Sequence, residues 1–214
     1  MSEKTGLPQA SRTPEKMSAC GHDGHTAILL GAAQYLAETR RFDGTVVLIF
    51  QPAEEGGAGG KAMIDDRLFD RWPIDEVYGL HNVPGLPVGQ IGITHGAMLA
   101  SADEFTVEVI GKGGHAAQPD KSVDPVVATG HILVALQSIA SGNADPVGSL
   151  VISVCSLETD THSHNIIPGA VSLQGTVRTL DPMIREMAEA RIRALVSATA
   201  EAFGAKAELN YHRH

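Results

Sequence analysis

Three clusters of cysteine, histidine and glutamate in the first half of the chain have the composition of a metal site. The clusters span Cys20–His25, Gln51–Gly56 and His81–Asn82. A cysteine and a histidine two positions apart place a thiolate and an imidazole within reach of one ion or of two neighbouring ions. Adjacent carboxylates that follow an apolar run repel each other and lose hydration, so a nearby cation would stabilise them. Together the clusters favour a metal centre.

Each cluster has a simpler interpretation when it is taken alone. Cys20 is also compatible with a buried thiol beside histidines that cap a helix, and acidic pairs are common on solvated loops. Other catalytic motifs are missing, because the chain contains no His-Glu-x-x-His segment and no Gly-x-Ser-x-Gly elbow. The glycine-rich stretch 56–60 is not a P-loop, which requires glycine where Glu55 stands and serine or threonine where Ala62 stands.

Alternating helices and buried strands are expected to position these clusters. Helix-forming residues occupy 26–38 and 60–68, and the short apolar runs 46–50 and 77–80 are typical of parallel strands covered on both faces. Folds of this class place ligands at the carboxyl ends of their strands, where the second and third clusters lie. We therefore expect a mostly parallel sheet in this half.

The second half changes to the two-residue period of strands that are buried on one face. Phe105, Val107 and Val109, for example, alternate with polar residues. The expected strands span 105–109, 150–154, 171–177 and 205–211, and the expected helices span 124–140 and 182–203. This order is that of a split β-α-β sandwich with two helices on one face of an antiparallel sheet. We expect two domains, 1–98 and 99–214.

Composition narrows the class of protein. Hydrophobic residues make up 43% of the 214-residue chain and charged residues 19%, which indicates a globular protein. The net charge of −9 argues against nucleic-acid binding, and no apolar run or N-terminal leader indicates a membrane or secretory signal. Two cysteines far apart do not form a disulfide framework, so a cytoplasmic location is expected.

Six motifs, in this order, resemble the M20 metallopeptidase family, specifically its branch of hippurate hydrolases and indole-acetyl-amino-acid hydrolases. They span 17–25, 51–55, 79–82, 111–116, 165–168 and 175–178. Ser18 stands where relatives usually carry histidine, a position that is not one of the family's ligands. The resemblance implies an α/β fold, with a partial, mostly parallel-sheet catalytic domain and a complete ferredoxin-like βαββαβ lid and dimerisation domain.

The resemblance also implies a centre of two divalent metal ions, with zinc, manganese, cobalt and nickel all compatible with its ligands. Cys20 would be the bridging thiolate, and His22, Glu55 and His81 would be further ligands. Glu54 would be the general base. The chemistry is consistent, because two cations polarise an amide carbonyl and lower the pKa of a shared water, and a carboxylate free of metal can accept its proton.

In the lid, the resemblance assigns three residues to the substrate. His115 would help to stabilise the tetrahedral oxyanion, and Asn165 and Arg178 would hold the free carboxylate. In relatives such groups reach the active site of the partner subunit, which implies a homodimer through the lid. Without the resemblance, His115 is equally compatible with a turn histidine and Arg178 with a surface cation.

The implied activity is hydrolysis of the amide bond of N-acyl amino acids such as hippurate. The alternatives are a catalytically incompetent fragment that acts as a dimerising or ligand-binding module, and an exopeptidase, which is disfavoured because peptidase branches usually carry aspartate where Cys20 stands. Family chains are longer and end with another ligating histidine, a position that His212 and His214 do not match. We therefore expect this chain alone to bind at least one metal weakly, to hydrolyse poorly and to leave its first domain exposed.

Overall fold

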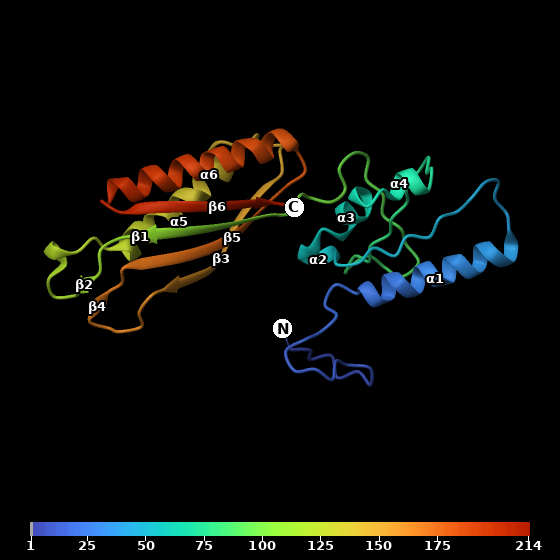
Figure 1. Ribbon diagram of the computed structural model, residues 1–214, viewed down its shortest axis with the longest axis horizontal. Helices are drawn as coiled ribbons and strands as arrows, with labels where there is room; N and C mark the ends of the chain where they lie inside the picture. Colours follow the sequence, from blue (N-terminus) through green and yellow to red (C-terminus); the bar gives the residue numbers. More distant parts are fainter. Residues whose placement is uncertain (1) are drawn as a thin grey trace. The chain divides into compact units, whose positions relative to one another are not determined.

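The computed structural model describes residues 2–214 and divides the chain into two compact units. The first unit extends to Gly92 and the second spans Ile93–His214 (Figure 1). The structure is mixed α/β, with its main sheet in the second unit. The domain limits 1–98 and 99–214 stay a prediction.

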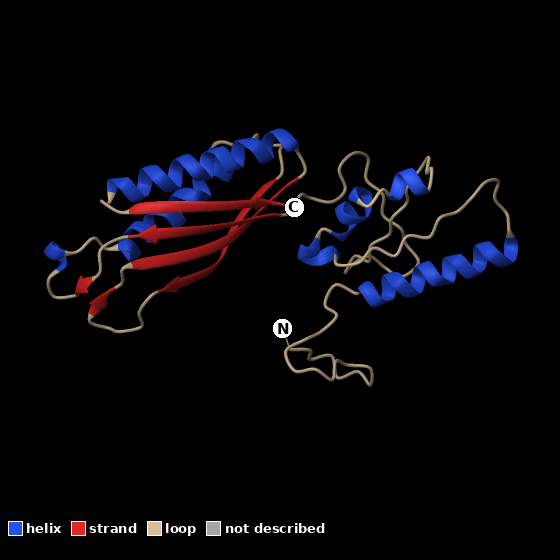
Figure 2. Cartoon of the chain, in the orientation of Figure 1, coloured by secondary structure: helices blue, strands red, loops and turns tan. Residues whose placement is uncertain are grey.

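The second unit is built on a four-stranded antiparallel sheet. Its strands are β1 (Asp103–Ile110), β3 (Leu150–Thr159), β5 (Ala170–Thr179) and β6 (Lys206–Arg213), in the order β3-β5-β1-β6. The helices α5 (Pro125–Gly142) and α6 (Pro182–Ala202) cover one face of this sheet (Figure 2). The order strand, helix, strand, strand, helix, strand is the one expected from the sequence.

Alternation along β1 explains why the sheet has one buried face. The side chains of Phe105, Val107 and Val109 are at most 2% exposed, whereas Glu104 and Glu108 face solvent. Burying apolar side chains of this size contributes roughly 1.5–3 kcal/mol each. The strand is therefore fixed in register by its own sequence.

Both helices of this unit begin as the sequence predicts. Asp124 caps α5 by accepting from the backbone of Val126, and Asp181 caps α6 by accepting from the backbone of Met183. A proline occupies the first helical position in each case, where its missing N–H is not needed. Gly204 follows α6 with φ of 72°, as a helix stop requires.

By length and composition, α5 is apolar enough to cross a membrane. Its buried residues, which include Ile132, Leu136 and Ile139, belong to the core that it shares with α6 and the sheet. Core helices of folded domains pass the same compositional test, so the finding is weak evidence for a membrane span.

A second, very short sheet was not predicted. It joins β2 (Gly114–His115) to β4 (Ile166–Ile167), with His115 opposite Ile166. A 3-10 turn, η1 (Pro119–Lys121), follows β2. Strands of two residues are too short to show a period in the sequence.

The first unit contains four helices and, among its described residues, no strand. The helices are α1 (His22–Thr39), α2 (Glu54–Gly57), α3 (Gly59–Asp65) and α4 (Leu68–Arg71). The segments 46–50 and 77–80, predicted to be parallel strands, do not form strands in this structure, since neither segment joins a ladder. An apolar run makes a strand only when another strand pairs with its backbone, and in this unit none does.

The side chains of the first unit remain largely exposed, as expected. Gly59 is its only buried residue among those that the structure describes. Val46, Phe50 and Val77 are 45%, 45% and 65% exposed. Apolar packing therefore contributes little to the arrangement of this unit, and its polar contacts matter correspondingly more.

Candidate metal centre

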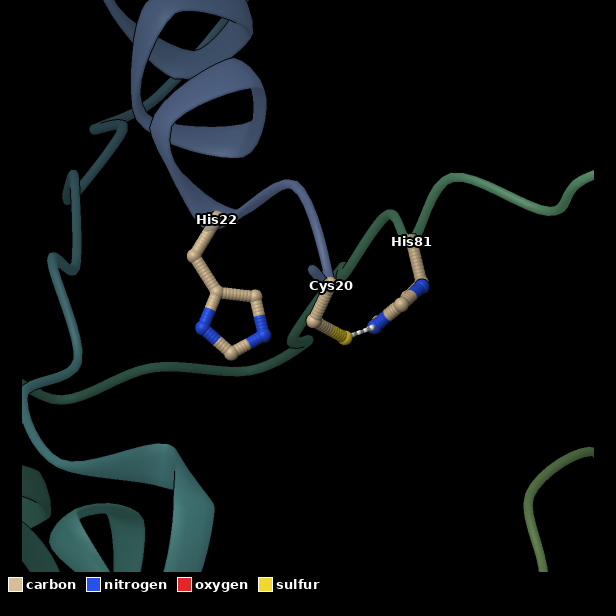
Figure 3. A group of neighbouring side chains, drawn as sticks. All are labelled: Cys20, His22 and His81. Carbon is tan, nitrogen blue, oxygen red and sulfur yellow. Dashed lines mark hydrogen bonds between the residues drawn. The ribbon is translucent and has the colours of Figure 1, made fainter. Parts of the chain in front are cut away.

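Three segments of the first unit bring the predicted ligands together. Cys20, His22 and His81 each offer one ligand atom, and these atoms lie within 4.8 Å of one another (Figure 3). His22 forms a second group of this kind with Glu54 and Glu55. The thiol, both imidazoles and both carboxylates thus form one cluster in which His22 belongs to both groups.

The start of α1 requires a glycine. Gly21 precedes the helix with φ of 78°, a left-handed conformation that other residues rarely adopt. A Cβ atom added at Gly21 would also lie 2.9 Å from Nδ2 of Asn82. The glycine therefore lets the backbone between Cys20 and His22 turn sharply while it lies against the segment that carries His81.

Nearby, Asp23 is held by the residue that departs from the family pattern. The hydroxyl of Ser18 donates to Oδ1 of Asp23 at 3.1 Å. This hydrogen bond and one from the backbone of Gly24 lower the pKa of the Asp23 carboxyl. Ser18 thus stabilises the ionised form of Asp23. A negative charge in the first turn of α1 favours the helix.

A neighbouring carbonyl sets the orientation of His81. Its Nδ1 atom lies 2.7 Å from the backbone oxygen of Asn82. Because a carbonyl can only accept, Nδ1 carries a proton, and in the neutral ring Nε2 then keeps a lone pair. That Nε2 atom lies 3.4 Å from Sγ of Cys20. A hydrogen bond from one ring nitrogen to a carbonyl is the usual support of a metal-ligating histidine.

The turn before α3 presents the two glutamates. Ala53 precedes them with φ of 48°, and Gly59 closes the turn where an added Cβ would collide with the backbone oxygen of Pro52. From this turn, Oε2 of Glu54 lies 3.4 Å from Nε2 of His22, and Oε1 of Glu55 lies 3.9 Å from the same atom.

The electrostatics of the cluster favour a cation. Burial raises the pKa of the Cys20 thiol, and the charges of Glu55 and Glu54 raise it further. Both carboxylates lie within 4 Å of Nε2 of His22, and no lysine or arginine among the described residues pairs with them. Thiolate, imidazole and carboxylate are the ligands that zinc and its neighbours take in proteins. The residues present therefore fit divalent metal ions.

The individual roles stay predictions. Cys20, His22 and His81 converge as ligands would, and Glu55 lies close enough to join them. Glu54, predicted to be the general base, lies nearer to His22 than Glu55 does. In this arrangement each of the two adjacent carboxylates can be the ligand or the base.

In the second unit, the structure brings His115 and Asn165 together. They belong to the segments paired by β2 and β4, and the backbone N–H of Ala116 donates to the oxygen of Asn165 at 3.0 Å. Nδ1 of His115 accepts from the backbone of Ala117 at 3.1 Å. A neutral His115 would then carry its proton on Nε2, which makes that atom a donor suited to an oxyanion.

Arg178 does not lie beside this pair. It occupies β5 opposite Val151, near the end of the strand that is remote from β4. The eight residue-to-residue steps from Ala170 to Arg178 span roughly 26 Å of extended chain. The sheet therefore separates Arg178 from His115 and Asn165 within one copy.

The sequence motifs contain His25 and Asn82, which adjoin the cluster, but no role was predicted for either residue. Nε2 of His25 lies 2.6 Å from Oδ1 of Asn82 and 3.0 Å from its backbone nitrogen. The spacing of His22 and His25 was a signal, since residues three apart on a helix share a face.

Comparison with known proteins agrees with the family resemblance of the sequence motifs. A family model described as "Peptidase family M20/M25/M40" matches residues 2–212. Hippurate hydrolase of Campylobacter jejuni is 43% identical over 210 residues, which cover 98% of this chain and 54% of that protein. N-acetyl-L-cysteine deacetylase of Bacillus subtilis is 44% identical over 211 residues, covering 98% and 50%. An Arabidopsis thaliana IAA-amino acid hydrolase is 40% identical over 191 residues, covering 89% and 43%.

Among solved structures, the Bacillus subtilis YXEP protein is described as a dinuclear metal binding peptidase of this family. It matches with a TM-score of 0.75 and 35% identity, over 99% of this chain and 53% of that one. The chain thus spans about half the length of the curated relatives it matches.

Proposed function

This chain belongs to peptidase family M20/M25/M40, and from that premise we propose that it cleaves the amide bond of N-acyl amino acids with two divalent metal ions. The products are a carboxylic acid and an amino acid. Relatives named hippurate hydrolase and N-acetyl-L-cysteine deacetylase support the reaction type, since both names describe removal of an acyl group from an amino acid.

One observation carries the proposal. Cys20, His22 and His81 come from the start of α1 and from a segment some sixty residues further on, and their ligand atoms lie within 4.8 Å of one another. A thiol and two imidazoles that converge beside two carboxylates are the donor set of a metal site, and mutual repulsion of the adjacent carboxylates is relieved by a cation.

The residues divide the work as follows. When bound, the metal ions polarise the amide carbonyl and activate the attacking water. The ions would be held by Cys20, His22, Glu55 and His81. Glu54 takes the proton of the water and passes it to the leaving nitrogen, as a carboxylate not used as a ligand can.

The lid supplies the contacts to the substrate. Nε2 of His115 donates to the oxygen that becomes negative in the tetrahedral intermediate. Asn165 and the guanidinium of Arg178 hold the free carboxylate of the amino acid. Because Arg178 is remote from His115 and Asn165 in one copy, a small substrate needs the lid of a second copy. This separation supports the proposal of a homodimer.

We propose that the second unit is this ferredoxin-like lid and the first unit is part of a catalytic domain with a mostly parallel sheet. The strand order β3-β5-β1-β6 supports the former. The exposed apolar segments 46–50 and 77–80 support the latter, because they lack the neighbours that such strands require. Both cysteines are free thiols, which supports a reducing compartment such as the cytoplasm.

A second candidate is a dimerising or ligand-binding module without catalysis. It is favoured by the exposure of the first unit. Ligand side chains that lack packed neighbours are held loosely, and a loosely held site catalyses poorly. A panel of benzoyl-, acetyl-, indole-acetyl- and aminobenzoyl-amino acids, assayed with zinc, manganese, cobalt or nickel, separates the two. Cleavage that requires metal and a free substrate carboxylate supports the hydrolase, whereas bound metal without cleavage of any member supports the module.

A further inference from the structure

His25 lies beside the metal cluster but belongs to neither ligand group. Its ring packs against that of His81, with centroids 4.5 Å apart and planes inclined by 64°. Its Nε2 atom lies 2.6 Å from the side-chain oxygen of Asn82 and 3.0 Å from its backbone nitrogen, so that Nε2 donates to the oxygen in one tautomer and accepts from the N–H in the other. Nε2 of His25 is therefore directed at Asn82.

Asn82 connects His25 to the ligand His81. Its nitrogen and its side chain contact His25, while its backbone oxygen accepts from Nδ1 of His81. Holding Asn82 in place thus fixes the carbonyl that selects the tautomer of His81. That tautomer leaves the Nε2 lone pair of His81 directed towards Cys20.

Little else in the first unit fixes this arrangement. Residues 79–82 are all exposed, and no strand or apolar core among the described residues of the unit holds them against α1. The contacts from α1 and its start to this segment are polar or aromatic, and they come from Cys20, His22 and His25. Of these contacts, the one made by His25 leaves the ligand atoms themselves free for a metal.

We propose that His25 is a positioning residue, which acts through Asn82 to orient His81 as a metal ligand. The inference rests on the proposed metal centre and adds to it a residue outside the ligand set. Partners of this kind typically change metal affinity 10–100-fold when they are removed.

The test compares His25→Phe, which removes both ring nitrogens, with His25→Gln, whose amide reaches the position of Nε2. Asn82→Ala is a second variant, which removes the side-chain contact and retains the backbone contacts. His95→Phe, at an exposed position of the other unit, is the matched control. The full chain is used throughout, and helix content by circular dichroism verifies that each variant is folded.

Two readouts are measured. The first is cobalt affinity, followed by the sulfur-to-cobalt absorption that Cys20 produces. The second is the tautomer of His81 in the metal-free chain, from long-range proton–nitrogen correlation spectra. We expect His25→Phe to lower cobalt affinity about 10–100-fold and to remove the preference of His81 for a proton on Nδ1. Asn82→Ala shifts both in the same direction, His25→Gln restores most of the affinity, and His95→Phe changes neither.

Wild-type cobalt affinity in His25→Phe, or an unchanged His81 tautomer, overturns the positioning role. Equal losses in His25→Phe and His25→Gln also overturn it, because a specific contact should be partly restored by the amide. A wild-type chain that binds no cobalt instead contradicts the proposed metal centre, and the tautomer alone then decides whether His25 orients His81.

Discussion

The sulfur of Cys20 lies 3.4 Å from Nε2 of His81, although 61 positions separate the two residues in the sequence. A contact between residues so far apart in the sequence is specified by the fold and does not follow from local spacing. It joins the start of α1 to the segment 79–82, and both atoms belong to proposed ligands of the metal centre.

Replacing Cys20 with alanine should remove the thiolate ligand. We expect metal affinity to fall by at least about 100-fold, since a ligand matters more than the residues that orient it. Metal content after dialysis, measured by mass spectrometry, checks this. Cys155→Ala is the control, because Cys155 is exposed on β3 and outside both ligand groups. Equal metal content in the two variants would argue against the site.

Glutamine at positions 54 and 55 should separate the base from the ligand. Glu54→Gln should keep its metal and lose roughly 100- to 10,000-fold in kcat, the contribution of a general base. Glu55→Gln should lose metal. Metal content and turnover measured on the same samples check both outcomes, and the reverse pattern would exchange the two roles.

A buried ion pair should make the stability of the second unit depend on pH. Asp103 is fully buried, accepts from Nε of Arg185 at 3.0 Å and accepts from the hydroxyl of Tyr211 at 2.7 Å. Burial alone raises the pKa of Asp103, but the hydrogen bonds from Arg185 and Tyr211 outweigh it and lower the pKa below 3.8. Because the folded pKa is the lower one, this stabilisation is present above about pH 4 and is lost as the pH falls further.

Asp103→Asn should test this ion pair. It leaves the guanidinium of Arg185 without its partner carboxylate, so we expect a loss of about 3–5 kcal/mol at pH 7. Urea unfolding at pH 7, 5 and 3 measures the effect, and the difference between variant and wild type should shrink towards pH 3. A constant difference across this range would show that the charge of Asp103 is not responsible.

Mixing two inactive variants should test the contribution of a second lid. A copy with His115→Ala retains Glu54, and a copy with Glu54→Gln retains His115. If His115 acts in the site of the partner, mixed dimers contain one complete site, and activity should recover to about a quarter of the wild-type level. Subunit exchange followed by an activity assay checks this. Failure to recover in a verified mixed dimer would place His115 and Glu54 in the same copy.

The second unit was predictable because its pattern is periodic. Phe105, Val107 and Val109 alternate with polar residues, and aspartates precede the prolines that begin both helices. The first unit was less predictable. Val46 and Phe50 have the composition of a buried strand, but pairing depends on neighbours that the local sequence does not specify.

Residue type and motif single out the proposed metal ligands, whereas they do not indicate the contacts that support these residues. The contact between His25 and Asn82 joins residues 57 positions apart through polar atoms, and no periodicity indicates it. The same holds for the separation of Arg178 from His115, which depends on the direction and length of β5. Both relationships follow from the folded structure and not from the local sequence.

X-ray absorption at the zinc edge of the zinc-loaded chain tests the metal centre most directly. The account predicts one sulfur scatterer at about 2.3 Å together with nitrogen or oxygen scatterers at about 2.0 Å, and loss of the sulfur signal in Cys20→Ala. A spectrum of wild-type protein that contains nitrogen and oxygen neighbours and no sulfur would contradict it.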